Sequence, residues 1–312
     1  MYPTQMHLDY IPYGPILEHE PNALHYTIYY PIGFFTLKPK KIPYVQWKTL
    51  AQCRHYSYQK VYMPGDYVND FFLDGTYPIW EQELEILLEC YDIEGLDLSK
   101  QIYILKRENV ALKAYMEELY KGKSTNTGTK KYYFKILLNS LYGKFLSRPD
   151  GIYISYANGK RTKCDDEDRP TYYLPLGMFI AMMGRVTLIK AMLSIPYDNV
   201  LYCDTDSIIY IGDKDPDVNI GPYMGDWSIE NENFSAYIVG PKTYQELNPD
   251  GKLITKCAGL SQIILPKLPF QDLAIGKEYN VIKSRRDKNT WQINLVKTTF
   301  KISDRVGVLR ER

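Results

Sequence analysis

The chain has 312 residues, of which 45% are hydrophobic and 24% are charged, and its formal net charge is +1. This length and hydrophobic share allow one large core or two modest ones, and they exclude an intrinsically disordered chain. No continuous apolar run of about 18 residues is visible, and the start MYPTQMHLDY lacks the basic and apolar regions of a signal peptide. We therefore expect a soluble cytoplasmic protein of one to three subdomains without membrane contact.

The cysteines and histidines favour neither a disulfide framework nor a zinc site. The five cysteines, at positions 53, 90, 164, 203 and 257, are an odd number without a CxxC pair. The four histidines, at positions 7, 19, 25 and 55, show no metal-ligand spacing. We expect reduced thiols, mostly in the core, and we expect any metal ion to be bound by carboxylates.

The small net charge averages over segments of opposite sign. Residues 121–163 hold ten Lys or Arg against one acid, and residues 277–312 hold ten against four. Residues 200–236 hold eight acids and one lysine. Two basic surfaces beside an acidic centre suit a polyanion held around bound cations, although ordinary solvated faces would give the same pattern.

In chain order, residues 1–80 are rich in Pro, Gly and Tyr and predict strands and turns. The apolar residues of WEQELEILLECY recur at helical spacing, the strand-like QIYILK follows, and ENVALKAYMEELYKGK again predicts a helix. The polar stretch STNTGTKK reads as a linker. A helix over KYYFKILLNSLYGKF should then end near Gly143.

Further along, Asn158-Gly159 within GIYISYANGKRTK predicts a β-hairpin with a two-residue turn. Residues 175–195 predict a helix. The β-rich runs NVLYC and SIIYIG then bracket Asp204, Thr205 and Asp206, so these residues should lie at the tip of a hairpin with buried arms. The remainder is mixed, with strand-like ends, and the whole pattern indicates an α+β fold.

Asp204 and Asp206 are the candidate metal ligands. Alternate residues of an extended chain share a face, so the two carboxylates can point the same way at the edge of a sheet. Carboxylates so placed repel each other unless a cation lies near them, and Mg²⁺, with Mn²⁺ as an alternative, suits oxygen ligands. A solubilising turn is the plain alternative, whereas a calcium loop is disfavoured because Ile208 and Ile209 follow where oxygen ligands are needed.

Lys131, Lys135, Asn139 and Tyr142 recur at intervals of four, four and three residues and should therefore line one helix face. Lysines one turn apart can bind consecutive phosphates of a triphosphate, while a tyrosine ring beside the small Gly143 can pack against a base and sugar. The alternative is an exposed basic helix side with a structural tyrosine.

Taken together, these two segments resemble motifs of the family B DNA polymerases. KILLNSLYGKF resembles KxxxNSxYG and YCDTDS resembles YxDTDS, in the family's order and with the short spacing of the phage enzymes that are primed by a terminal protein. Lys242-Thr243-Tyr244 resembles the KxY motif that contacts primer DNA, and KCAG at 256–259 resembles the junction into the thumb. Residues 178–185 resemble the Tx2GR/AR segment, with Ala181 in place of its threonine.

The resemblance covers essentially the whole chain and implies a right-hand polymerase with a mixed antiparallel palm sheet. The implied divisions are 1–13 for the start of the palm, 14–110 for a first insertion that contacts the terminal protein, 111–146 for the fingers, 147–171 for a second insertion, 172–256 for the palm and 257–312 for the thumb.

The resemblance also implies template-directed addition of deoxynucleotides to a 3′ hydroxyl, primed by a protein or by DNA, in phage-type replication. The partners would be template–primer DNA, deoxynucleoside triphosphates and a terminal protein, and the chemistry would be two-metal nucleotidyl transfer. The implied roles are metal binding by Asp206 and Asp204, triphosphate binding by Lys135 (also catalytic), Lys131 and Lys123, a nucleotide pocket of Tyr2, Asn139, Tyr142 and Gly143, and DNA contacts by Ser140, Arg185, Lys242, Tyr244 and Lys256.

The opening residues match only the end of the family's first carboxylate motif, DxxSxYP. Tyr2 fits its sugar-selecting position, but the aspartate would lie before Met1. We therefore expect a chain that begins inside a longer protein, lacks the exonuclease domain and needs a missing N-terminal half for activity. A catalytically inactive fragment that binds DNA or a terminal protein is the alternative, and a reverse-transcriptase fold is disfavoured because those palms carry adjacent aspartates rather than DTD.

Overall fold

The computed structural model describes residues 8–40, 68–74, 78–145, 154–157, 160–163, 173–240, 242–260, 268–286 and 292–302. These residues divide into two compact units, of which the first holds the described residues up to Trp227 and the second those from Ser228 onwards. The described residues form helices and antiparallel sheets, as an α+β fold predicts, and all of their α-helices lie in unit 1.

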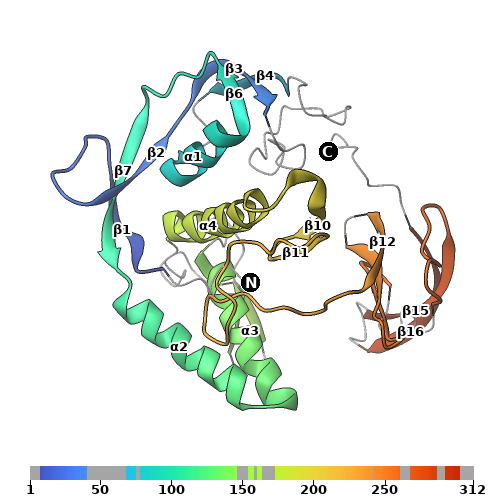
Figure 1. The fold of residues 1–312 in the computed structure, drawn as a ribbon. Helices are drawn as coiled ribbons and strands as arrows, with labels where there is room; N and C mark the ends of the chain where they lie inside the picture. The colour runs from blue at the N-terminus through green and yellow to red at the C-terminus, as the bar shows by residue number, and fades with distance from the viewer. Residues whose placement is uncertain are drawn as a thin grey trace. The chain divides into compact units, whose positions relative to one another are not determined.

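Two antiparallel sheets form the first part of unit 1, where the sequence predicts strands and turns (Figure 1). The four-stranded sheet has the order β1 (Tyr10–Leu17), β7 (Gln101–Glu108), β2 (His25–Tyr29) and β5 (Ile79–Trp80). In the three-stranded sheet, β3 (Ile32–Pro39) lies between β4 (Val68–Asp74) and β6 (Tyr91–Glu94). Strands far apart in the chain thus pair directly, and β7 is the strand that leads into the next helix.

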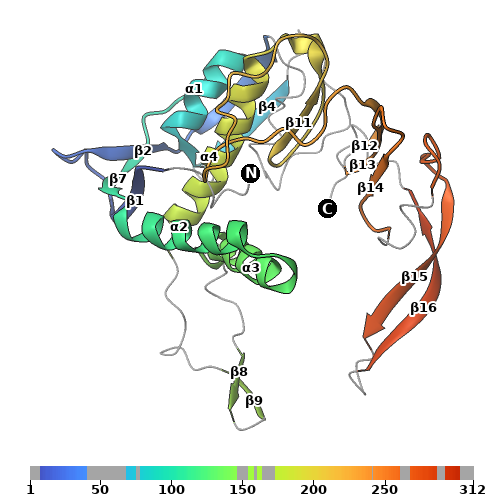
Figure 2. The same cartoon turned by 60° about the horizontal axis from the view of Figure 1, so that its bottom comes forward.

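The helices of unit 1 are α1 (Glu81–Cys90), α2 (Val110–Thr125), α3 (Gly128–Phe145) and α4 (Leu174–Leu193), as the apolar spacing predicts. The predicted linker is wrong in extent, because α2 continues to Thr125 and α3 begins at Gly128. Gly128 has a φ of 56°, which only glycine adopts without strain, and this lets the chain reverse within two residues. α2 and α3 consequently pack side by side (Figures 1 and 2).

α4 is the central helix of unit 1 and packs against α1, α3, β1 and β11. The Phe179 ring lies 5.1 Å from Trp80 and 4.5 Å from Tyr26, measured between centroids. Leu176 and Ile180 join a second cluster with β1 and the end of α3. Burial of each such side chain stabilises the fold by about 1.5–3 kcal/mol, so α4 holds the surrounding elements in place.

The same helix corrects the expectation that the chain holds no apolar segment of membrane-spanning length. An 18-residue window of this 20-residue helix has a mean hydropathy of 1.6, and the helix suffices in length and composition to cross a bilayer. Half of that segment is buried inside the protein. A helix that packs against neighbours on several sides is apolar around its circumference, which explains the composition.

β10 (Val200–Asp204) and β11 (Ser207–Tyr210) form the predicted antiparallel hairpin, with Asp204 opposite Ser207. The expectation of buried arms is wrong: Leu201 is 43% exposed, and most other residues of the two strands are half-buried. The reason is that the two strands form a sheet of their own, with α4 packed against β11.

The hairpin predicted around Asn158-Gly159 is confirmed by β8 (Ile154–Ala157) and β9 (Lys160–Lys163), in which Ala157 pairs with Lys160 (Figure 2). The turn itself and the rest of the 147–171 segment lie outside the described residues.

Unit 2 contains a three-stranded antiparallel sheet of β12 (Ser235–Gly240), β13 (Thr243–Leu247) and β14 (Leu253–Cys257), and a hairpin of β15 (Glu278–Arg286) and β16 (Ile293–Lys301). Its core includes Cys257, Leu273 and Val281. Cys90 and Cys257 are buried and Cys203 is half-buried, while Cys53 and Cys164 lie outside the described residues.

Candidate functional site

Three of the predicted triphosphate-binding lysines come together from two helices. Lys123 lies in the last turn of α2, and Lys131 and Lys135 lie on α3. Burial, and then the positive charges of Lys135 and Lys131, lower the pKa of Lys123. Desolvation and like charge both disfavour an ammonium group, so the shift shows that the three side chains are within electrostatic reach. Helix packing therefore creates a patch of positive charge that suits an anion.

Tyr120 is a neighbour of this patch that sequence reasoning did not single out. The Lys123 Nζ lies 5.2 Å from the centroid of the Tyr120 ring, a cation–π distance. The Tyr120 hydroxyl donates a 3.0 Å hydrogen bond to the carbonyl of Pro222, in the segment that follows β11. The sequence shows that Tyr120 lies three residues before Lys123, but it gives no sign of Pro222, which lies 102 residues further along the chain. Among 30 tyrosines nothing local distinguishes it.

The remaining predicted residues of α3 differ in their surroundings. The enclosed side-chain oxygen of Asn139 has no hydrogen-bond partner among the described residues, which costs about 1–3 kcal/mol. The Ser140 hydroxyl donates to the carbonyl of Leu137 at 2.9 Å. A Cβ added at Gly143 would have no described atom within 4 Å, so space is open there. The side chain of Tyr142, and Tyr2 as a whole, lie outside the described residues.

Asp204 and Asp206 lie at the hairpin tip, but not as alternate residues of one extended strand. Asp204 is the last residue of β10, and Asp206 lies in the turn, so strand alternation does not fix their directions. The Asp204 Oδ1 accepts hydrogen bonds from the backbone N–H of Thr205 at 2.7 Å and from its hydroxyl at 3.1 Å. Both aspartates are half-buried. A tight turn therefore places two carboxylates close together in sequence and partly open to solvent.

These carboxylates fit a hard divalent cation that keeps water or phosphate ligands. Among the described residues, no group of three or more His, Cys, Asp or Glu side chains could enclose a metal ion. Mg²⁺ is commonly bound by one or two carboxylates together with water and substrate phosphates, and Mn²⁺ accepts the same oxygen ligands. The donor set does not fit zinc, which prefers Cys and His.

α4 connects the hairpin with the lysine-bearing helices. α3 and β11 both pack against α4. The hydrogen bond from Tyr120 to Pro222 also ties the segment after β11 to α2. Figures 1 and 2 show the hairpin beside α4 within this unit. That the aspartates and the lysines face one cleft remains a prediction.

Arg185, a predicted DNA contact, is held by an acid on α1. Its Nε donates to the Glu83 Oε1 at 3.1 Å, and its Nη2 contacts the same oxygen. The Glu83 side chain is 4% exposed, and that of Arg185 is 35% exposed. The guanidinium group thus joins α4 to α1 and presents part of its surface to solvent.

In unit 2, three predicted DNA contacts lie at one end of the sheet. Tyr244 on β13 pairs directly with Lys256 on β14, so their side chains share a face. Lys242 comes immediately before β13, and its carbonyl accepts a 2.9 Å hydrogen bond from the N–H of Ala258. Its φ of 55° is a left-handed conformation that strains a residue with a Cβ. Strain of this kind is most often retained where a side chain has a function.

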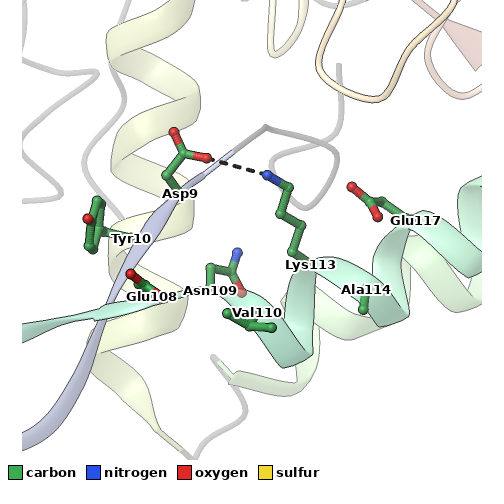
Figure 3. Close-up of a pocket in the computed structure, with 8 residues that line it drawn as sticks. All are labelled: Asp9, Tyr10, Glu108, Asn109, Val110, Lys113, Ala114 and Glu117. Atoms are coloured by element: carbon green, nitrogen blue, oxygen red, sulfur yellow. Dashed lines mark hydrogen bonds and ion pairs between the residues drawn. The ribbon is translucent and has the colours of Figure 1, made fainter.

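Figure 3 shows a pocket at the opposite end of α2 that contains none of the predicted site residues. Lys113 reaches across it to Asp9, with 3.4 Å between Nζ and Oδ1, and the Asn109 side chain donates to the carbonyl of Leu8 at 3.0 Å. Lys113 and Lys123 are ten positions apart on the same helix, which is about 15 Å along the axis. The pocket marks the joint between β1 and α2.

Comparison with known proteins supports the resemblance read from the motifs. The profile of the family "DNA polymerase type B, organellar and viral" matches residues 1–219. The chain therefore belongs to this family of DNA polymerases.

Relatives and solved structures agree with this assignment. The DNA polymerase of Bacillus phage phi29 is 29% identical over 308 residues, covering 88% of this chain and 52% of that protein. The DNA polymerase of Streptococcus phage Cp-1 is 26% identical over 331 residues, covering 97% and 55%. The phi29 DNA polymerase complexed with primer-template DNA and incoming nucleotide substrates has a TM-score of 0.72 at 26% identity, covering 97% of this chain and 56% of that chain. The chain thus spans about half the length of these relatives.

Proposed function

We propose that this chain carries the nucleotide-binding and primer-binding part of a DNA-directed DNA polymerase, primed by a terminal protein or by DNA in phage-type replication. The observation that carries the proposal is the convergence of Lys123, Lys131 and Lys135 in the same compact unit as the hairpin of Asp204 and Asp206. α4 supports both groups. The relatives named above are DNA polymerases, which agrees with this reading.

In this proposal, the carboxylates bind the metal ion and the lysines bind the phosphates of the triphosphate. Asp206, assisted by Asp204, holds Mg²⁺ or Mn²⁺, and the cation supplies charge neutralisation at the transferring phosphate. Lys135 and Lys131 bind the phosphates, and Lys123 adds a third positive charge. Holding the α-phosphate in line with the primer hydroxyl, and stabilising the charge that develops on the leaving pyrophosphate, accounts for most of the rate enhancement.

The other predicted residues complete the contacts with nucleotide and DNA. By their motif positions, Gly143, Tyr142 and Tyr2 contact the base and sugar, and Asn139 and Ser140 order this pocket next to the template. Lys242 and Lys256 bind phosphates of the primer strand, and the Tyr244 ring packs against its sugar. Arg185 offers its exposed N–H groups to a further phosphate.

The proposed architecture is a right hand. α4 and the β10–β11 hairpin belong to the palm, α2 and α3 to the fingers, and residues 257–312 to the thumb. Residues 14–110 and 147–171 form the two insertions, of which the first contacts the terminal protein, and the protein acts in the cytoplasm of the host cell. The boundary between the two compact units follows Trp227, so unit 2 contains both the β12–β14 sheet, which carries the KxY motif, and the proposed thumb segment.

Metal-dependent nucleotide binding tests this proposal on the 312-residue chain itself. We expect a deoxynucleoside triphosphate to bind to the wild-type chain when Mg²⁺ is present. Asp206→Asn should weaken that binding by roughly tenfold or more, which is the effect of losing one charge-assisted contact. The thermal midpoint of the variant should not fall. Asp213→Asn is the matched control, because Asp213 is an exposed acid of the same segment.

Equal binding by Asp206→Asn and Asp213→Asn would contradict the assignment of the metal site. Binding of primer–template without any metal-dependent nucleotide binding would instead support a DNA-binding role without catalysis.

A further inference from the structure

Gly122 lies in the last turn of α2, at a helical position where glycine is ordinarily unfavourable. A Cβ at this position would lie 2.5 Å from Cε1 and 2.6 Å from Cδ1 and Cζ of Phe134 on α3. These distances are far inside van der Waals contact, so any larger residue would have to displace the ring. Close approach of the two helices therefore explains the glycine.

On both helices this contact is adjacent to the lysines of the cluster. Lys131, Phe134 and Lys135 are spaced i, i+3 and i+4 on α3 and share one helix face. On α2, Gly122 immediately precedes Lys123. The lowered pKa of Lys123, caused by burial and then by Lys135 and Lys131, agrees with three ammonium groups gathered around the packed ring.

The α2 side of the contact is held firmly by side-chain caps. The carbonyl of Gly122 accepts a 2.7 Å hydrogen bond from the Asn126 side-chain amide. The carbonyl of Lys121 accepts hydrogen bonds from the hydroxyls of Thr125 at 2.8 Å and Ser124 at 3.0 Å. These side-chain bonds brace the last turn of α2 at the residues next to its contact with Phe134.

We propose that Gly122 and Phe134 are positioning residues for triphosphate binding, because the phenyl ring seated against Gly122 sets the separation of α2 and α3 at which three lysines match one triphosphate. The inference rests on the proposed function for the identity of the ligand. The converging groups are ammonium groups, which recognise charge and not a base, so the contact governs affinity for the triphosphate moiety whatever the base.

Gly122→Ala tests the proposal, because the added methyl group favours the helix yet must displace the Phe134 ring from its present position. We expect the affinities for a Mg²⁺-bound deoxynucleoside triphosphate and for inorganic tripolyphosphate to fall together, by roughly tenfold, with no fall in thermal midpoint. Calorimetric titration measures both affinities. The pKa of Lys123, measured by NMR on ¹³C-labelled lysine, should rise toward its usual value as the like charges separate.

Two further variants separate positioning from helix stability. Ala114→Gly makes the reverse exchange at an exposed position of the same helix and should leave both affinities within about twofold, although it weakens the helix. Phe134→Ala should weaken binding by itself. Adding Gly122→Ala to Phe134→Ala should cost no further affinity, because the ring that the methyl group would meet is gone.

The possible results distinguish this inference from the proposed function. If Gly122→Ala binds both ligands like the wild type and leaves the pKa of Lys123 unchanged, the inference is overturned and the proposed function stands. If the wild type binds neither ligand, the proposed function fails, and the pKa comparison still decides whether the contact positions the lysines.

Discussion

At the scale of single residues, Lys123 is repelled by two neighbouring positive charges in the candidate site. Its pKa is lowered from 10.5 by burial and by two neighbouring lysines. A lowered pKa in the folded state means that folding favours the neutral amine. Above the pKa of Lys123 in the unfolded chain, the side chain is neutral in both states and costs no stability. As the pH falls through its lower pKa in the folded state, the side chain becomes charged there and the free energy of unfolding decreases. At neutral pH the charged side chain destabilises the ligand-free fold, and an anionic ligand would relieve this repulsion.

Lys123→Gln should consequently raise the thermal midpoint at pH 7, by on the order of 1–2 °C, and lower triphosphate affinity roughly tenfold. The midpoint difference from wild type should shrink as the pH approaches that of the lysine titration. Thermal unfolding between neutral and alkaline pH measures the first effect, and ligand titration measures the second. Lys121→Gln, at an exposed position of the same turn, is the control. A lower midpoint in Lys123→Gln would contradict this explanation.

Lys242 allows charge and backbone strain to be separated. Lys242→Ala and Lys242→Gly remove the same ammonium group, but only glycine relieves the strain of a φ of 55°. We expect both variants to lose similar affinity for primer–template DNA, measured by fluorescence anisotropy. In urea unfolding, the glycine variant should be more stable than the alanine variant by about 1 kcal/mol. Equal stabilities would show that the left-handed conformation carries no strain.

At the scale of elements, the pair of Arg185 and Glu83 joins α4 to α1. The two partners are unequally buried, since the Glu83 side chain is 4% exposed and that of Arg185 is 35% exposed. A buried carboxylate that loses its partner has no access to water, whereas a guanidinium group at the surface can be solvated.

Arg185→Met should therefore destabilise unit 1 by roughly 3 kcal/mol, and Glu83→Gln should cost clearly less. The double variant with Met at both positions should recover much of the loss, because no buried charge remains. Urea unfolding measures all three. If Arg185 acts chiefly as a phosphate contact, Arg185→Met would lose DNA affinity with little change in stability, which would contradict the structural reading.

The elements themselves were largely predictable, because periodicity is a local signal. The spacing of Leu84, Leu87 and Leu88 predicts α1, and the β-rich runs around Asp204 predict the β10–β11 hairpin. Relations between distant segments were not predictable in this way. Nothing near Arg185 in sequence points to Glu83 on α1, because that pairing is decided by how α1 and α4 pack.

The candidate site was predictable to a similar degree. The spacing of Lys131 and Lys135 on one helix predicts a shared basic face, whereas Lys123 was named only through the family resemblance, and the structure places it on a second helix. Gly122 was available as a signal, since a glycine inside a helical pattern often marks close packing. The partner that explains it, Phe134, depends on the α2–α3 turn, which the polar stretch between the helices obscured.

At the scale of the whole molecule, two compact units each carry part of the proposed DNA and nucleotide contacts. Binding through lysines to phosphates releases counterions, so primer–template affinity should fall steeply with salt. With about six phosphate contacts, the loss between about 50 and 200 mM salt is roughly 10³-fold. Lys256→Ala should reduce the slope of log affinity against log salt by about one, whatever the DNA sequence. An unchanged slope would remove Lys256 from the DNA interface.

The central claim is that the carboxylates of the hairpin tip and the lysines of α2 and α3 act on one triphosphate. Paramagnetic relaxation by Mn²⁺, with a deoxynucleoside triphosphate bound and the lysine side chains ¹³C-labelled, tests it most directly. We predict that Mn²⁺ broadens the signals of Lys131 and Lys135 much more than that of Lys113, and that Asp206→Asn abolishes the difference. Equal broadening of all lysines, or a pattern unchanged by Asp206→Asn, would show that the two groups do not share a site.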